Sequence, residues 1–309
     1  MTEKMEEKSM VPYLALILVQ ILFGLNFPAS KVILEYFPPV LWSSVRMAIA
    51  AVLMFISAFI IVPKDQRKFD FRFLQKTFIY GFFGIVLCQT FFMVGLKNTT
   101  ATNGAVLNTL IPIFTLLVAI ILGKEKLTVN RAFGFLIAVL GVLILRKIED
   151  FQASSATMKG DLFMIMNCLS LAIFFAISRD FLRANSAFWV TAWMFFFGSI
   201  VIGLFCLQDM HLIFETHIDG RLAGAMAYNV IGATMLTYFL NSWTLKKVSA
   251  SSVAVFIYMQ PVIAVAYAWF VQNDPPSMRT ILAVGCIFVG VMVGVVKRPG
   301  RKVETTQTA

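Results

Sequence analysis

Two stretches of this chain match each other at a constant offset of 149 positions. The first covers residues 96–142 and the second residues 245–291, and no gap interrupts the match. Identical pairs join Leu96-Lys97 with Leu245-Lys246, Ala105-Val106 with Ala254-Val255, Pro112 with Pro261 and Gly141-Val142 with Gly290-Val291, and conservative pairs join Glu125 with Asp274 and Thr128 with Ser277. Because the offset is nearly half of the 309 residues, the sequence predicts one structural unit used twice.

The composition places most of the chain in lipid. Hydrophobic residues make up 59% of it and charged residues only 14%, whereas soluble domains are about 45–50% apolar and about 25% charged. A net charge of +10 on such a chain is typical of the cytoplasmic loops of a membrane protein, so it does not by itself indicate nucleic-acid binding.

Nothing in the sequence indicates a metal site or a cofactor. Cys88, Cys168, Cys206 and Cys286 lie in or at the end of apolar runs, without a CxxC motif, and are interpreted as small buried residues. The two histidines, at 211 and 217, share one polar loop without a suggested third ligand. Motifs of the GxSxG, HExxH and GxxxxGK[ST] types are missing too, so we do not expect an enzyme or an ATP site.

Ten apolar runs approach the length of about 20 residues that a helix needs to cross a bilayer. They are Tyr13–Leu34, Val40–Val62, Phe73–Leu96, Thr102–Leu122, Val129–Leu145, Gly160–Leu182, Ala187–Leu207, Arg221–Leu245, Ala250–Val271 and Arg279–Val296. With the N-terminus inside, 18 Lys and Arg residues fall in inner segments and 7 at outer ends. This bias predicts that both termini are cytoplasmic.

The number of spans gives the repeat its direction. Spans three to five correspond to spans eight to ten, and five spans per half is an odd number. The second half should therefore be inverted in the membrane, as in many secondary transporters. We predict an all-α integral membrane protein of ten transmembrane helices in two inverted five-helix repeats, with a cytoplasmic N-terminus (1–12), a first repeat (13–146), an outer linker (147–159), a second repeat (160–296) and a disordered cytoplasmic tail (297–309).

Prolines and glycines predict the shape of these helices. Pro112 and Pro261 lie near the middle of spans four and nine, and Pro28 lies in span one. A proline inside a helix removes a hydrogen bond and kinks it, and paired breaks in two halves indicate a transport site, although such kinks can also serve helix packing alone. Thr128 and Ser277 suit helix N-caps. Glycines at 134, 141, 285, 290 and 294 predict close packing of spans five and ten, within the bundle or in a homodimer.

The chain resembles the drug/metabolite transporter superfamily, specifically its EamA-type ten-helix members. The resemblance lies in Leu110-Ile-Pro112-Ile-Phe, Leu122-Gly-Lys-Glu125-Lys-Leu127 and Gly134…Gly141-Val142, in Met259-Gln-Pro261-Val-Ile, Asn273-Asp274 and Gly285…Gly290-Val291, and in Phe23-Gly24-Leu-Asn26-Phe. Two departures are Phe23, where Trp is common, and Asp274-Pro275-Pro276 in place of the usual Glu and turn. The resemblance implies a central cavity between inverted halves, alternating access, and transport of amino acids, other small metabolites or drugs, mostly outward.

Uncharged polar and aromatic residues inside the spans, together with Arg46, are the candidates for a cavity lining, and none of the 16 acids falls at a midplane. The candidates are Asn26, Arg46, Gln89, Asn108, Asn167, Tyr238, Asn241, Trp243, Tyr258 and Gln260, and Tyr228 and Asn229 also lie inside. Hydrogen bonds between helices are the alternative role for each. Arg46 either pairs with Glu35 or with carbonyls at a helix end, or attracts a substrate carboxylate.

These features predict a secondary transporter in a bacterial inner membrane that exports amino acids or related metabolites, with a small-molecule substrate and membrane lipid as its partners. A membrane-embedded sensor or assembly protein with the same fold is the alternative. A lipid-modifying enzyme is disfavoured, because no cluster of catalytic His, Asp or Cys is present.

Overall fold

The computed structural model describes residues 10–99, 104, 107–145, 155–272 and 277–295, and every regular element in these residues is helical. Of the predicted segments, residues 1–9, 147–154 and 297–309 lie outside this part, as does Asp274. The α-helices are α1 (Val11–Tyr36), α2 (Pro39–Ile61), α3 (Phe71–Gly81), α4 (Cys88–Asn98), α6 (Leu110–Ile121), α7 (Val129–Leu145), α8 (Ser155–Arg183), α9 (Ala187–Leu204), α10 (Leu212–Glu215), α11 (Gly220–Ala227), α12 (Thr237–Leu245), α13 (Ala250–Val255), α14 (Met259–Gln272) and α15 (Met278–Val295).

Six continuous helical stretches in the described residues are long and apolar enough to cross a membrane. They are Val11–Tyr36, Pro39–Ile61, Phe71–Asn98, Met158–Arg183, Ala187–Leu204 and Gly220–Leu245, and shorter apolar helices cover Leu110–Ile121, Val129–Gly141 and Met278–Val293. Each of the six overlaps a predicted span closely. The protein is therefore an all-helical, multi-pass membrane protein.

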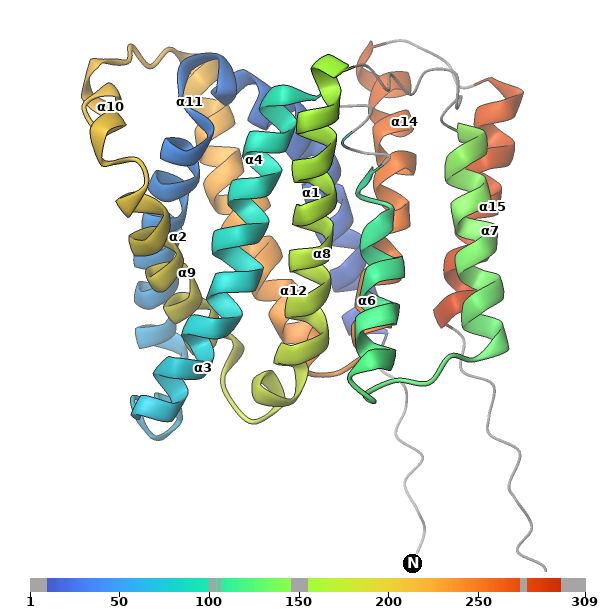
Figure 1. Cartoon of the computed structure of the whole chain (residues 1–309), viewed down its shortest axis with the longest axis horizontal. Coiled ribbons are helices and arrows are strands. Elements are labelled where there is room, and N and C mark those ends of the chain that lie inside the picture. Colours follow the sequence, from blue (N-terminus) through green and yellow to red (C-terminus); the bar gives the residue numbers. More distant parts are fainter. Residues whose placement is uncertain (1–9, 100–103, 105–106, 146–154, 273–276, 296–309) are drawn as a thin grey trace, which may run out of the picture.

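The helices stand side by side in one bundle (Figure 1). α2 packs on α9 at one edge, and α7 packs on α15 at the opposite edge. Between the two pairs, α1 contacts α12 and α14, while α8 contacts α4 and α6. Helices from the two halves of the sequence therefore meet in the middle of the bundle.

Two of the long stretches contain a π-helical segment. One is η2 (Phe82–Leu87), between α3 and α4, and the other is η5 (Tyr228–Leu236), between α11 and α12. The 149-residue offset moves residues 82–87 onto residues 231–236, inside η5. A π-helical turn shifts the backbone hydrogen bonds by one residue and often occurs at functional sites. These segments were not predicted from the sequence.

The two predicted proline breaks take a specific form. Asn108 and Thr109 form a turn before α6, and a 3₁₀ turn, η6 (Phe256–Tyr258), precedes α14. Pro112 is the third residue of α6, and Pro261 is the third residue of α14. Because Pro112 has no N–H to reach the Asn108 carbonyl, that oxygen accepts from Ile111 N instead, at 3.1 Å. The helical path is thus interrupted just before each proline.

The structure confirms both predicted N-caps and the close packing of α7 on α15. Thr128 Oγ1 accepts from Arg131 N at 3.4 Å, and Ser277 Oγ accepts from Thr280 N at 3.3 Å. A Cβ atom on Gly290 would lie 2.5 Å from Ala138 N and 2.7 Å from Gly134 O of α7. The predicted contact is therefore made within the chain, and it depends on the missing side chain.

Substitution Gly290→Val should destabilise this pair of helices. The backbone atoms of α7 cannot move away like the end of a side chain, so overpacking should cost about 1–3 kcal/mol or more. Gly285→Val is the matched control, because a Cβ there meets nothing within 4 Å. Thermal unfolding in detergent micelles compares the two, and equal midpoints would contradict this view of the packing.

Candidate functional site

A small cavity lies in the middle of the bundle, between helices from both halves of the sequence. Its volume is about 50 Å³. Because one water molecule needs about 10–15 Å³ by this measure, the cavity has room for a few waters. Seven predicted candidates line it, namely Asn26, Gln89, Asn108, Asn167, Tyr238, Asn241 and Gln260.

Other lining residues were not predicted. They are Gln20, Phe23, Phe27, Cys88, Phe92, Ile111, Leu171, Phe175, Ala233, Val253 and Ile257. Gln20 could have been found, because it is an amide in an apolar run like the other candidates. The aromatic members could not, since nothing in the spacing of the 31 phenylalanines separates those that face a cavity from those that face lipid.

Arg46 of α2 is 1% exposed and is held by two amide oxygens. Its NH1 group donates to Asn229 Oδ1 at 3.2 Å, and its NH2 group donates to Gln89 Oε1. The predicted partners were Glu35 or helix-end carbonyls, and both are wrong, since Glu35 is exposed and the acceptors are side chains. Arg46 is not among the residues that line the cavity, but Gln89 is.

Asn229 of η5 is the residue at which three helices meet. Its Oδ1 atom also accepts from Trp42 Nε1 of α2 at 2.7 Å. Its Nδ2 atom donates to Asn26 Oδ1 at 2.6 Å and to Ser30 Oγ at 3.2 Å, both in α1. The side chain is fully buried. The sequence placed Asn229 inside a span but did not identify it as part of the site.

Gln89 and Tyr238 contact each other, although they occupy corresponding positions in the two matched copies. Gln89 Nε2 donates to the Tyr238 hydroxyl. The hydroxyl in turn donates to Gly84 O, in η2, at 2.9 Å. The hydrogen-bonded path from Arg46 thus reaches the π-helical segment through Gln89 and Tyr238.

Two further amide–amide contacts join residues that line the cavity. Asn167 Nδ2 of α8 donates to Asn108 Oδ1 at 3.4 Å, and Cys88 Sγ donates to Asn167 Oδ1 at 3.1 Å. Gln260 Nε2 of α14 donates to Gln20 Oε1 of α1 at 2.9 Å. Asn241 also lines the cavity, and its side chain makes no hydrogen bond within the described residues.

The last two candidates lie away from the cavity lining. Trp243 is half-buried, and the Lys247 ammonium lies 4.1 Å from the centre of its ring. Tyr258 is fully buried against Phe135, and its hydroxyl has no hydrogen-bond partner in the described part of the chain. Both were predicted from polarity alone, which does not report the direction of a side chain.

Substitution Tyr238→Phe should lower the free energy of unfolding by about 1–3 kcal/mol, because Gln89 Nε2 and Gly84 O would each lose a buried partner. Tyr258→Phe is the matched control: it removes a hydroxyl that has no partner in the described residues, so stability should stay the same or rise. Unfolding in detergent micelles measures both variants. Equal losses would show that the Tyr238 bonds add nothing to stability.

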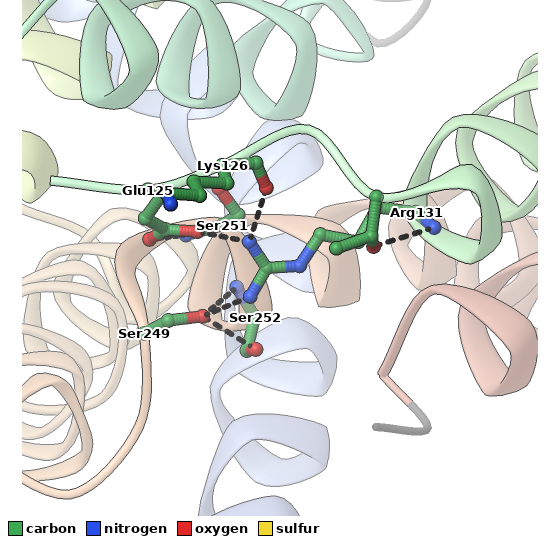
Figure 2. A network of polar contacts seen from close by, with 7 residues as sticks. Glu125, Lys126, Arg131, Ser249, Ser251 and Ser252 are labelled. Atoms are coloured by element: carbon green, nitrogen blue, oxygen red, sulfur yellow. Dashed lines mark hydrogen bonds and ion pairs between the residues drawn. The ribbon is translucent and has the colours of Figure 1, made fainter. Parts of the chain in front are cut away.

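A second polar cluster lies where the connection after α6 meets the start of α13 (Figure 2). Glu125 Oε2 forms an ion pair with Arg131 NH1 at 2.7 Å, and Glu125 Oε1 accepts from Ser251 N at 3.2 Å. Arg131 NH2 also donates to Ser249 Oγ at 3.5 Å. The Glu125 side chain is 6% exposed. This pair therefore joins the first half of the sequence to the second.

The same connection is also tied to α8. Lys124 Nζ lies 2.7 Å from Asp180 Oδ2, in an ion pair more exposed than that of Glu125. A polar cavity of about 230 Å³ lies beside it, lined by Ala119, Lys124, Glu125, Ala176, Arg179, Asp180 and Ala250. This end of the bundle is thus held mainly by charged groups, whereas the centre is held by amides.

Comparison with known families assigns the chain. The model of the EamA-like transporter family matches twice, at residues 10–147 and 158–296. The chain belongs to the EamA-like transporter family. The resemblance to the drug/metabolite transporter superfamily is confirmed, and both halves of the chain carry the family's sequence pattern.

Several full-length EamA-like relatives share low but extended identity with the chain. An uncharacterized transporter of Archaeoglobus fulgidus is 26% identical over 94% of this chain and 100% of its own length. The uncharacterized transporter YyaM of Bacillus subtilis is 26% identical over 93% of this chain and 95% of its own. A WAT1-related protein of Arabidopsis thaliana, At4g01430, is 23% identical over 98% of this chain and 91% of its own length. These names indicate transporters rather than enzymes.

A protein of known crystal structure has the same fold. It superimposes with a TM-score of 0.74 over 93% of this chain and 96% of its own, at 17% identity. That identity supports the fold alone. The helical bundle described above is therefore one that an EamA-like chain shares with an experimentally determined structure.

Proposed function

We propose that this protein is a secondary transporter that carries a small metabolite, an amino acid or a related compound, through the central cavity by alternating access. The observation that carries the proposal is the cavity itself, which lies among helices of both halves and is lined by seven amides and a tyrosine. Polar groups in a membrane are costly unless they have partners or contact water or substrate. Outward transport, in a bacterial inner membrane, follows the resemblance to the family.

Two five-helix halves in opposite orientations would account for several features together. The 149-residue repeat, the paired π-helical segments and the paired prolines occur at corresponding positions. A residue that touches its own counterpart must lie near the axis that relates two copies, and Gln89 touches Tyr238 in this way. The excess of Lys and Arg in alternate loops supports cytoplasmic termini.

Alternating access requires that the cavity open to one side at a time. At about 50 Å³ the cavity is smaller than the 300–1,000 Å³ of ordinary ligand sites, so helices must separate to admit a metabolite. The Glu125–Arg131 cluster is suited to control the separation of the helices at the end of the bundle that we assign to the cytoplasm (Figure 2). It holds the start of α13, which leads to the lining residues Val253 and Ile257.

Counterflow in proteoliposomes tests the function. Purified protein, loaded with an unlabelled amino acid or metabolite from a panel, should accumulate the labelled compound, and protein-free liposomes should not. Arg46→Ala should lower the rate by about tenfold or more, because a hydrogen bond to a charged group contributes about 1.5–3 kcal/mol. Tyr238→Ala should lower it too, because Gln89 Nε2 and Gly84 O each lose a buried partner.

A folded protein that gives no counterflow with any compound would favour the sensor or assembly role. Size-exclusion chromatography of each variant shows whether a loss of flux comes from a loss of folded protein. Unchanged flux in both variants would exclude the central site assignment.

Substitution Glu125→Gln should favour opening of the end that the cluster closes. It removes a charge-assisted contact worth about 1.5–3 kcal/mol, so the open population should rise by about tenfold or more. Cys88 lines the cavity and can report this opening in a variant with Ala at 168, 206 and 286. Its rate of labelling by a water-soluble maleimide in detergent should rise accordingly.

Glu215→Gln is the control, because this acid is exposed on α10, away from the cluster. It should leave the labelling rate of Cys88 unchanged. A Glu125→Gln protein that labels no faster than the control would show that the cluster does not hold the cavity closed.

A further inference from the structure

Arg46 is a buried cation that has no neutralising acid among the residues that the structure describes. Two ion pairs occur in the described part of the chain, Lys124–Asp180 and Arg131–Glu125, and neither involves Arg46. Its Nε atom is buried and has no hydrogen-bond partner in the same residues. A buried charge that lacks a counter-ion is strongly unfavourable. An anion that enters the site would therefore be attracted to it.

The guanidinium fixes the direction of the amides around it. Arginine only donates hydrogen bonds, so Gln89 and Asn229 must turn their oxygens toward Arg46. The NH2 groups of both amides then point the other way. Asn229 Nδ2 donates a hydrogen bond to Asn26 Oδ1, so Asn26 turns its oxygen toward Asn229. The Asn26 NH2 group points away and has no hydrogen-bond partner in the described residues.

Two cavity-lining amides, Asn26 and Gln89, are therefore oriented by Arg46, one of them through Asn229. Both direct N–H donors away from the cation. Gln89 Nε2 donates one of its two hydrogens to the Tyr238 hydroxyl and keeps the other for a ligand. Donors backed by a positive charge favour a ligand group that accepts hydrogen bonds and is negative. The rest of the wall holds five further amides together with apolar side chains, among them Phe27, Phe92 and Phe175.

We infer that the transported compound carries a carboxylate that binds at Asn26 and Gln89, and that Arg46 is the positioning residue that makes this site selective for the anion. The inference rests on the proposed function and specifies its substrate class. Arg46 need not touch the substrate, because it acts through Gln89 and Asn229. The apolar part of the substrate lies against the phenylalanines.

A matched pair of probes tests the charge alone. The anion 3-phenylpropanoate and the neutral 3-phenylpropanamide differ only in the group that would face Asn26. Protection of Cys88 from maleimide, with Ala at 168, 206 and 286, gives an apparent Kd for each. With the wild-type residues at 46 and 229, the apparent Kd of the anion should be about tenfold or more lower than that of the neutral amide, as expected for a charge-assisted contact.

Two variants should remove this preference by different routes. Arg46→Met deletes the charge, and Asn229→Asp supplies an internal carboxylate 3.2 Å from it with almost no change of shape. In both, the ratio of the two Kd values should fall to about one. Arg46→Lys keeps the charge and should retain most of the preference. The ratio separates selectivity from a general loss of stability, and Asn229→Asp should fold even if Arg46→Met does not.

Equal protection by the two probes, or none by either, would contradict the inference, as would a preference that persists in Asn229→Asp. Counterflow without anion preference would contradict the inference and leave the proposed transport intact. Anion preference without counterflow would contradict the proposed transport and leave a protein that binds carboxylates.

Discussion

The centre of the bundle depends on how Arg46 is held. A guanidinium buried among apolar helices must find acceptors, and here they are the side-chain oxygens of Gln89 and Asn229. These two bonds connect α2 to the stretch that contains α4 and to η5, and Asn229 extends the connection to α1. Four helical segments are therefore joined around one cation, and three of them, α1, α4 and η5, line the cavity. The orientation of two amides in the cavity wall, Asn26 and Gln89, follows from it.

Irregular helical backbone is concentrated around the same place. Both π-helical segments, η2 and η5, contribute to the Arg46 network, η2 through Gly84 O and η5 through Asn229. A shifted hydrogen-bond pattern frees a carbonyl, and Gly84 O is paired with the Tyr238 hydroxyl. At the edge where α15 packs on α7 the helices are regular and pack through small residues, since Gly290 of α15 lies directly against the backbone of Gly134 and Ala138. The irregular helical backbone and the buried polar side chains thus occupy the same part of the molecule.

Much of this site was predictable because polar side chains in apolar runs are few. The rule that each needs a partner or a cavity identified Asn26, Gln89 and Tyr238 correctly as lining residues. The same rule misplaced Trp243 and Tyr258, whose side chains turn away from the cavity. It also assigned a wrong partner to Arg46, since an exposed acid nearby in sequence is a poorer partner than a buried amide nearby in space.

The sequence by itself determined a membrane protein built from a repeated unit, because hydropathy, span length and the 149-residue match are properties of the chain order. It also determined the N-caps at Thr128 and Ser277, which depend on contacts three residues away. Only the tertiary structure decided that Arg46 acts on Asn229, 183 positions away, and that Gln89 meets Tyr238. Such contacts depend on the rotation of each helix about its axis, which is set by packing against its neighbours.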